Sequence, residues 1–410
     1  MNKTLFSRDF TLMLLGQIVS LLGNALLRFA LSLYVLDLTG SAAVFGGVLA
    51  AAMVPTILLS PVGGVLADRV PRQRIMYVLD FLTAIAVWNF GMFGRGGSTL
   101  PPALLLFSLS AIQACYQPSV LSAVPLLVPQ EELTRANALV TQVAALSSLL
   151  GPVLGGALYG FWGMGPICLV SGGCFLASAV MECFLRIPFA PAPGKGRIMT
   201  AWGDLREAGR FLSRSGLLPL LGVVAGINLA LSALYMVGLP YFVKITLALS
   251  SQLYSLVEAA MGFGSILGAV LAGILGSRLS FSRSWRHLLL AALSPAVMIP
   301  AVAVTAFPLG SYLILLLSAL MGMTCAGVFS ILAQTYFQTV TPASLLGKVG
   351  SFVTAIATCA IPLGQGIYGL LLDRLPPYVS PALALAICLP LTALAKKVLE
   401  RPQKNPLKKV

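Results

Sequence analysis

Long apolar runs separated by short polar segments dominate the pattern of the chain. Each run is long enough to cross a hydrocarbon core of roughly 30 Å as an α-helix. The alternation of apolar and polar positions that is typical of membrane β-strands is absent from these runs,. The pattern therefore predicts an all-α integral membrane protein with twelve spans, at residues 10–36, 42–67, 75–94, 102–127, 137–160, 165–186, 216–243, 252–276, 288–307, 311–339, 349–372 and 380–396.

The composition supports this class. The chain has 410 residues, of which 58% are hydrophobic and 9% charged, whereas about a quarter of the residues of a soluble domain are charged. The first run follows Lys3 and Arg8, as the apolar core of a signal peptide would. It is too long for such a core, contains Arg28 and shows no small-residue cleavage site,. We therefore expect a retained helix.

The net charge of +14 raises the possibility of a nucleic-acid partner. The position of the charges argues against one. With the N-terminus placed in the cytoplasm, all but four of the 26 Lys and Arg residues fall in cytoplasmic segments, as the positive-inside rule requires. We expect a multi-pass protein of the inner or plasma membrane with both termini cytoplasmic, and basic loops that lie against anionic lipid headgroups.

One long polar connection, from Arg186 to Gly216, separates six spans from six. The predicted domains are a bundle at 1–186, a cytoplasmic linker with an amphipathic helix at 187–215, a second bundle at 216–396 and a basic tail at 397–410,. A shift of 209 residues aligns "GVLADRVPRQR" with "GILGSRLSFSR". This alignment favours two pseudo-symmetric repeats that can move against each other.

A cluster of charges lies between the second and third spans, at Asp68, Arg69, Arg72 and Arg74. An acid at a helix end can pair with a neighbouring helix, while arginines hold the loop in the cytoplasm. The alternative is a basic loop that only sets the topology. Such a loop would need neither Asp68 nor the spacing from Gly64.

The stretch "GVLADRVPRQR" resembles motif A of the major facilitator superfamily, a Gly-x-Leu-Ala-Asp-Arg pattern followed by basic residues. It departs from that motif at Pro71, where Gly is usual, and at Gln73, where a basic residue is common. The resemblance implies that Asp68 and Arg69, assisted by Arg72, tie neighbouring helix ends together and latch one conformation.

The fifth span contains "SSLLGPVLGGALYG", which resembles motif C of the exporting branches of this superfamily. Gly151, Pro152, Gly155 and Gly156 match the pattern Gly-x-x-x-Gly-Pro-x-x-Gly-Gly, and Ser147 replaces its first Gly. Small residues on one face let a second helix approach closely, and Pro152 bends the helix. The alternative is small-residue packing without any meaning for transport direction.

Most of the chain resembles the branch that holds macrolide-efflux proteins and the enterobactin exporter, through "GQIVSLLGNALLRFAL", "VPQEELTRANAL", "VEAAMGFGSILG" and "LLGKVGSFVTAIATCAIPLGQGIYG". The resemblance implies the major facilitator fold, which has 12 transmembrane helices in two pseudo-symmetric six-helix bundles. It also implies a secondary transporter, and we expect a monomer.

In this family the substrate cavity lies between the two halves, and helices 1, 4, 7 and 10 line it. Each of the matching spans carries a polar stripe, which lipid would not tolerate. In the first span, for example, the stripe recurs every three or four residues. The alternative is hydrogen bonding within a closed bundle. The cavity candidates are Gln17, Asn24, Gln113, Gln117, Asn228, Tyr235, Gln334 and Gln338.

Charges inside the membrane cost about 2.5 to 3.5 kcal/mol each and are therefore functional candidates. Glu258 is the first choice for a proton carrier, with a structural pairing to a basic residue as the alternative. Asp80 is a second candidate, although we expect it to join the motif A network. Arg28 is the third proton-coupling candidate and either recognises an anionic substrate or neutralises a carboxylate. Glu182 is expected to anchor its helix at the membrane interface.

Enzyme chemistry has no support in the sequence. There is no GxxxxGK[ST] loop and no Ser-His-Asp set, and the seven cysteines and lone His287 form no ligand cluster,. No cofactor or metal is expected. The prediction is a proton-coupled antiporter that exports an amphipathic small molecule, such as a macrolide, by rocker-switch alternating access and confers antibiotic resistance. The alternatives are an exporter of a siderophore, lipid or other metabolite, and a non-transporting sensor or scaffold.

Overall fold

The computed structural model describes residues 6–188, 197–215, 217–275, 281–342 and 345–400. Within these ranges twelve segments are long and apolar enough to cross a membrane, which confirms the predicted all-α class and number of spans. Several helices extend beyond the apolar runs that predict them. The first, for example, covers Arg8–Thr39, whereas its apolar run covers 10–36.

The contacts divide the chain into two compact units. The first unit consists of Met1–Gly40 and Val48–Arg197. The second consists of Ser41–Gly47 and Ile198–Val410. The short segment Ser41–Gly47 therefore packs with the C-terminal residues, although it precedes most of the first unit in the sequence.

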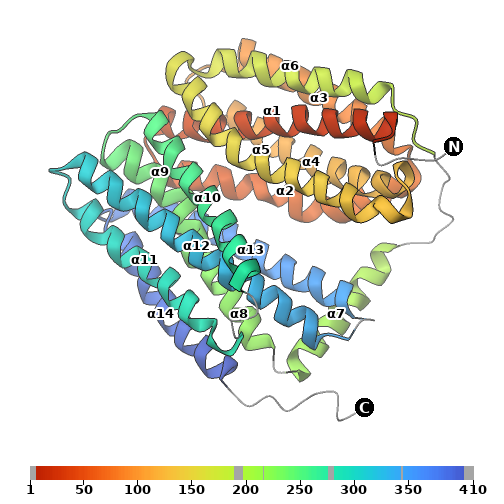
Figure 1. The fold of residues 1–410 in the computed structure, drawn as a ribbon. Helices are drawn as coiled ribbons and strands as arrows, with labels where there is room; N and C mark the ends of the chain where they lie inside the picture. The colour runs from red at the N-terminus through yellow and green to blue at the C-terminus, as the bar shows by residue number, and fades with distance from the viewer. Residues whose placement is uncertain (1–5, 189–196, 216, 276–280, 343–344, 401–410) are drawn as a thin grey trace. The chain divides into compact units, whose positions relative to one another are not determined.

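The first unit is built around its N-terminal helix, which packs against α4, α5 and α6, while α6 also packs against α3. Figure 1 shows these helices from red to yellow. Their bounds are α1 (Arg8–Thr39), α2 (Ala42–Arg69), α3 (Arg72–Phe93), α4 (Leu100–Leu127), the 3₁₀ turn η1 (Gln130–Glu132), α5 (Leu133–Trp162) and α6 (Met164–Cys183).

Local sequence sets both ends of α1. The Ser7 hydroxyl accepts a hydrogen bond from the backbone N–H of Phe10 at 3.3 Å, which satisfies one of the free donors of the first turn,. At the other end Gly40 adopts φ 62°, a left-handed conformation that glycine adopts without steric cost,. Its N–H donates to the Leu36 carbonyl at 2.8 Å, so the chain turns sharply into α2.

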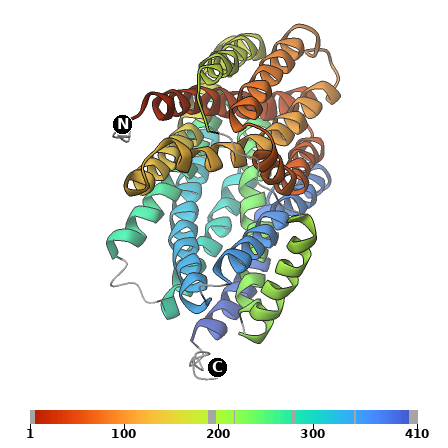
Figure 2. The same ribbon diagram turned by 90° about the vertical axis from the view of Figure 1, so that its right-hand side faces the viewer.

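In the second unit α12 packs against both α10 and α11, and α11 packs against α14. Figures 1 and 2 show these helices from green to blue. The bounds are α7 (Arg197–Arg214), α8 (Leu218–Ile227), η2 (Asn228–Ser232), η3 (Leu234–Gly238), α9 (Leu239–Tyr241), η4 (Phe242–Thr246), α10 (Ser251–Leu275), η5 (Phe281–Arg283), α11 (Trp285–Ala303), α12 (Pro308–Val340), α13 (Leu346–Arg374) and α14 (Val379–Leu399).

The seventh span, Leu218–Thr246, is not a regular α-helix. Three π-helical turns, η2, η3 and η4, interrupt it. A π turn widens the helix by one residue and changes which side chains face a neighbour, and such turns are frequent at functional sites. The irregular part of this span contains the predicted cavity residues Asn228 and Tyr235.

Large apolar side chains remain exposed over much of both units. Leu58, Leu169 and Leu363, for example, are 65%, 68% and 64% exposed. A soluble monomer rarely exposes extensive apolar surface, whereas helices in contact with lipid tails do so throughout. The exposed surface therefore agrees with twelve membrane spans.

Candidate functional site

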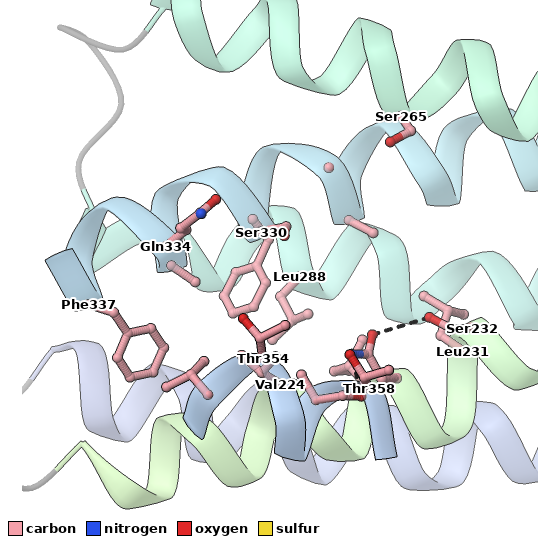
Figure 3. Close-up of a pocket in the computed structure, with 18 of the residues that line it drawn as sticks. Val224, Leu231, Ser232, Ser265, Leu288, Ser330, Gln334, Phe337, Thr354 and Thr358 are labelled. Carbon is pink, nitrogen blue, oxygen red and sulfur yellow. Dashed lines mark hydrogen bonds between the residues drawn. The ribbon is translucent and has the colours of Figure 1, made fainter. Parts of the chain in front are cut away.

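The second unit contains a pocket of about 820 Å³. Its walls come from the seventh span, α12 and α13, with Ser265 of α10 and Leu288 of α11 also lining it. Figure 3 shows side chains of α12 and α13 reaching the pocket from different walls. Most of the lining side chains are apolar or small, and a few polar groups are placed among them.

Hydrogen bonds hold the polar groups of the seventh span in place. The Asn228 Nδ2 atom donates to the Ala357 carbonyl of α13 at 3.0 Å. The Ser232 hydroxyl donates to Asn228 Oδ1 at 3.2 Å, the contact drawn as a dashed line beside Ser232 in Figure 3. The Tyr235 and Ser294 hydroxyls share a hydrogen bond of 2.5 Å, so Tyr235 lines the pocket with its position fixed.

The α12 wall carries the other predicted polar residues of this unit. Gln334 and Gln338 are exposed and lie one turn apart, next to Ser330 and Phe337. All four predicted cavity residues of the C-terminal half (Asn228, Tyr235, Gln334 and Gln338) therefore lie in the wall of one pocket. Thr354 and Thr358 of α13 also line the pocket. They were not predicted, because they fall outside the four helices expected to line the cavity.

The polar stripe of α1 has a different environment. The Gln17 Nε2 atom donates to the Tyr116 hydroxyl at 2.8 Å, and that hydroxyl donates to Glu182 Oε1 at 2.6 Å. The Ser20 hydroxyl donates to Asp80 Oδ1 at 3.3 Å. We call this group, from four helices of the first unit, the Asp80–Glu182 cluster; it comprises Gln17, Ser20, Asp80, Tyr116, Ser178 and Glu182.

Two expectations about acids are wrong. Glu182 is not an interfacial anchor, because it is 0% exposed and its carboxyl group points into the core, where it accepts from Tyr116. Asp80 bonds to Ser20 of α1 and not to an arginine of the residue 64–74 loop. The misleading signal was position along the chain, since the packing of α6 against both α1 and α3 cannot be read from a single helix.

The remaining candidates of the first unit bond to one another. The Arg28 guanidinium donates to Asn24 Oδ1 at 3.2 Å and to the Ser110 hydroxyl at 3.0 Å. No described carboxylate forms an ion pair with Arg28. Gln113 Nε2 donates to Gln117 Oε1 at 3.3 Å, one turn along α4.

Glu258, the first choice for a proton carrier, lies on α10. It is partly buried and accepts a hydrogen bond from the Tyr254 hydroxyl one turn earlier. It does not line the 820 Å³ pocket.

The loop that resembles motif A is described only in part. The Asp68 side chain lies outside the described residues, and a Cβ atom added at Gly64 would meet nothing within 4 Å. Arg69 and Arg74 are exposed. Arg72 Nε donates to the Ser122 hydroxyl of α4 at 2.8 Å, so this arginine connects the start of α3 to α4.

The glycines of the fifth span lie against α1. A Cβ atom on Gly151 would lie 2.3 Å from the Cβ of Ala25, and one on Gly155 would lie 3.1 Å from the Leu26 carbonyl oxygen. Gly156 and Pro152 are buried on the same helix. The close approach predicted from these small residues is present, and its partner is α1.

One polar contact of the second unit was not anticipated. The Asp373 carboxylate, at the end of α13, accepts hydrogen bonds from the Ser41 hydroxyl and from the backbone N–H groups of Ala42 at 2.7 Å and Ala43 at 3.2 Å. It therefore caps the first turn of α2. A sequence signal existed: "GLLLDR", ending at Arg374, repeats the Gly-x-Leu-x-Asp-Arg spacing of "GVLADR".

Twelve spans among the described residues, divided between two units, define a polytopic membrane protein, and the pocket in the second unit is large enough for a small-molecule ligand,. Among the described residues, no three His, Cys, Asp or Glu side chains are grouped to hold a metal ion. The family model of the Major Facilitator Superfamily matches residues 13–365. The chain belongs to this superfamily of membrane transporters.

Two kinds of exporter are among its relatives. Macrolide efflux protein A of Streptococcus pyogenes is 25% identical over 371 residues, which cover 88% of each chain. The enterobactin exporter EntS of Salmonella choleraesuis is 27% identical over 346 residues, which cover 79% of this chain and 76% of the exporter. The resemblance to this branch, predicted from four short stretches, is confirmed.

Solved structures share the fold at low identity. A bacterial homologue of the iron transporter ferroportin, in an inward-facing state, superposes with a TM-score of 0.73 at 20% identity and covers 96% of this chain and 99% of its own. The nucleoside transporter NupG superposes with a TM-score of 0.75 at 11% identity and covers 95% and 99%. These matches confirm the predicted major facilitator fold.

Proposed function

We propose that the protein is a secondary active efflux transporter that moves an amphipathic small molecule, such as a macrolide or another drug, out of the cytoplasm. The pocket of the second unit carries this proposal. Its volume of about 820 Å³ lies within the range of roughly 300 to 1,000 Å³ that suits drug-sized ligands. A mostly apolar wall with a few fixed amide and hydroxyl groups suits a molecule that is largely apolar but has several hydrogen-bonding groups.

The direction of transport rests on the relatives and on the fifth span. Both kinds of relative are named for export, and the motif C glycines pack α5 tightly against α1. In rocker-switch alternating access the two bundles would move, and residues 64–74 would latch one state. We place both termini in the cytoplasm of a bacterial-type cell membrane, from the distribution of Lys and Arg,, and propose a monomer.

The energy source that we propose is a proton gradient. The sequence has no nucleotide-binding GxxxxGK[ST] loop,, and it holds acids within the membrane that can take up and release a proton. Glu258 and Asp80 are therefore the two candidate proton carriers, and residues 64–74 are the part of the chain that we assign to gating.

Transport into proteoliposomes with an imposed pH gradient and a radiolabelled macrolide tests the proposal. Gln334→Leu removes one hydrogen-bonding group from the pocket wall and is expected to reduce uptake by about tenfold, because one unmet hydrogen bond of a buried ligand costs about 1.4 kcal/mol. Thr335→Val is the matched control, since Thr335 is the next residue of α12, is exposed and does not line the pocket.

Uptake that needs the pH gradient, is reduced by Gln334→Leu and is unchanged by Thr335→Val supports the proposal. Equal uptake by the Gln334→Leu and Thr335→Val variants would contradict the assignment of the pocket as the substrate site. An absence of transport for every drug and metabolite tested would instead favour a sensor or scaffold.

A second candidate function is export of an anionic metabolite such as a siderophore. One observation favours it: the Arg28 side chain bonds only to neutral groups among the described residues, Asn24 and Ser110, and no described carboxylate neutralises it. Arg28→Gln distinguishes the two candidates. It would abolish transport of an anionic catecholate probe but leave transport of a cationic or neutral drug close to the wild-type rate.

A further inference from the structure

The Asp80–Glu182 cluster is a polar site enclosed by the first unit. Asp80 and Tyr116 are each 2% exposed, and Gln17 and Glu182 are 0% exposed. Apolar side chains of the core, among them Met13 and Met76, surround it. The cluster joins α1, α3, α4 and α6, so any change of charge in it acts on four helices at once.

The cluster holds two acids and no base. The carboxyl groups of Asp80 and Glu182 lie close enough to interact electrostatically. The other titratable groups that face them are the Tyr116 hydroxyl and the Cys183 thiol, which carry no positive charge. No described Lys, Arg or His forms an ion pair with either acid.

The nearby arginines are engaged elsewhere. Arg28, on α1, bonds to Asn24 and Ser110. Arg72, at the start of α3, bonds to Ser122. Two bare carboxylates in an apolar core are strongly unfavourable, so the site requires a positive charge from outside the protein.

Unpartnered atoms show where that charge would bind. Asp80 Oδ2, Glu182 Oε2, Gln17 Oε1 and Ser178 Oγ are buried and have no hydrogen-bond partner among the described residues. Ser178 lies beside both carboxyl groups. A proton on a carboxyl oxygen would convert an unsatisfied acceptor into a donor, and Gln17 and Ser178 offer acceptors for it.

We propose that the Asp80–Glu182 cluster is the site that binds and releases the coupling proton, which rests on the proton antiport proposed above. Loading converts one carboxylate to a carboxylic acid. Release returns the proton to water and leaves a negative charge in the core. That charge weakens the packing of the four helices around the cluster, and this change couples proton binding to conformation.

The Asp80–Glu182 cluster lies close to the C-terminal end of α6, where a proton has a short path to the surface of the first unit. Glu182 is the penultimate residue of α6, next to the exposed Cys183. The Cys183 carbonyl accepts a hydrogen bond from Gln73 Nε2 at 2.9 Å, in an exposed contact. Gln73 lies in the first turn of α3, within the segment 64–74 to which we assign gating, so that segment and the proton site meet at the end of α6.

A metal ion or Na⁺ fits the cluster less well. Hard cations require about six oxygen ligands. Among the described residues no third acid, His or Cys joins the two carboxyl groups as a metal-binding group. The proton is therefore the occupant that we assign.

Infrared spectroscopy of the protein reconstituted in lipid tests the site without any substrate. The wild type is expected to show a carboxylic-acid C=O band that decreases as the pH rises. Asp80→Asn and Glu182→Gln, which keep the shape of each side chain, should each remove part of the band, and the double variant should remove the pH-dependent part. Glu131→Gln is the control, since Glu131 is exposed on η1, and should leave the band unchanged.

Three outcomes would overturn the site: a band that the double variant retains, a band that Glu258→Gln alone removes, or a band that responds to Na⁺ at constant pH and not to pH. The proposed function fails separately. If no drug or metabolite is transported but the band behaves as expected, the proposed proton site is supported and the proposed transport function is contradicted. If transport depends on a pH gradient but the double variant transports normally, the assignment of this site is wrong.

Discussion

The two units contain similar polar stripes but place them in opposite environments. In the first unit the side chain of Gln17 on α1 donates a hydrogen bond to the Tyr116 hydroxyl, which in turn donates to Glu182. In the second unit Gln334 and Gln338 of α12 face a pocket of about 820 Å³. Both stripes satisfy the rule that polar side chains avoid lipid, so the rule alone does not distinguish a closed network from an open site.

The difference follows from the side chains opposite each stripe. Around the Asp80–Glu182 cluster, bulky residues such as Met13, Met76 and Tyr116 fill the space. Around the pocket, many lining residues are small, among them Ala326, Gly327, Ala333, Gly350 and Ala357. These small side chains leave the volume of the pocket unfilled. This difference supports the proposed binding of substrate in the second unit and of the proton in the first.

The largest effect is expected from filling the pocket. Gly350 lines it, and a Cβ atom there would meet nothing within 4 Å, so Gly350→Phe is expected to fill part of the cavity with its ring. Substrate affinity should fall by at least about tenfold, or 1.4 kcal/mol. Gly366→Phe is the matched control, because Gly366 also has open space on α13 but does not line the pocket. Equilibrium binding of a labelled macrolide measures the affinity of both variants. Equal losses of affinity in Gly350→Phe and Gly366→Phe would contradict the assignment of substrate binding to the pocket.

An intermediate effect is expected from removing one hydrogen-bonding group of the Asp80–Glu182 cluster. Tyr116→Phe leaves the Gln17 amide and Glu182 Oε1 without their shared partner, and a buried unsatisfied group costs about 1–3 kcal/mol. The Tm of the purified protein should fall, while Tyr77→Phe should leave it unchanged, since Tyr77 is only partly buried on α3 and its hydroxyl makes no hydrogen bond within the described chain. An unchanged Tm for Tyr116→Phe would show that water already reaches the cluster.

The smallest effect is expected at Asp373. Asp373→Asn keeps one acceptor for the N–H groups of Ala42 and Ala43 but removes the negative charge at the start of α2. Charges at helix N-termini contribute about 0.3–1 kcal/mol, so thermal unfolding should show a slight decrease in Tm, and one that high salt reduces. A loss of stability well above this range would indicate that Asp373 does more than cap α2.

The spans and the family could be predicted from sequence because both depend on local signals. Apolar length reveals a span, and the residues 64–74 and 147–160 reveal the superfamily. The placement of polar residues could be predicted only in part. Gln334 and Gln338 lie in a pocket as expected, but Gln17 is closed off because Tyr116 and Glu182, distant in sequence, lie against it.

Two further features depend on contacts that a single span does not report. The π turns of the seventh span, which carry Asn228 and Tyr235, have no signal in its apolar pattern. Asp373 stands at the end of an apolar run, where an acid is ordinary, and only the structure shows that it caps α2. Packing between segments decides such features, whereas hydropathy reports on each segment alone.

Substrate exchange and gradient-driven accumulation, measured on the same proteoliposomes, test the division of labour most directly. Exchange of labelled for unlabelled substrate needs the pocket but no net proton movement. The account predicts that Gln334→Leu reduces both activities, whereas Asp80→Asn with Glu182→Gln retains exchange and loses accumulation driven by the pH gradient. A double variant that still accumulates substrate as the wild type does, or a Glu258→Gln variant that alone separates the two activities, would contradict it.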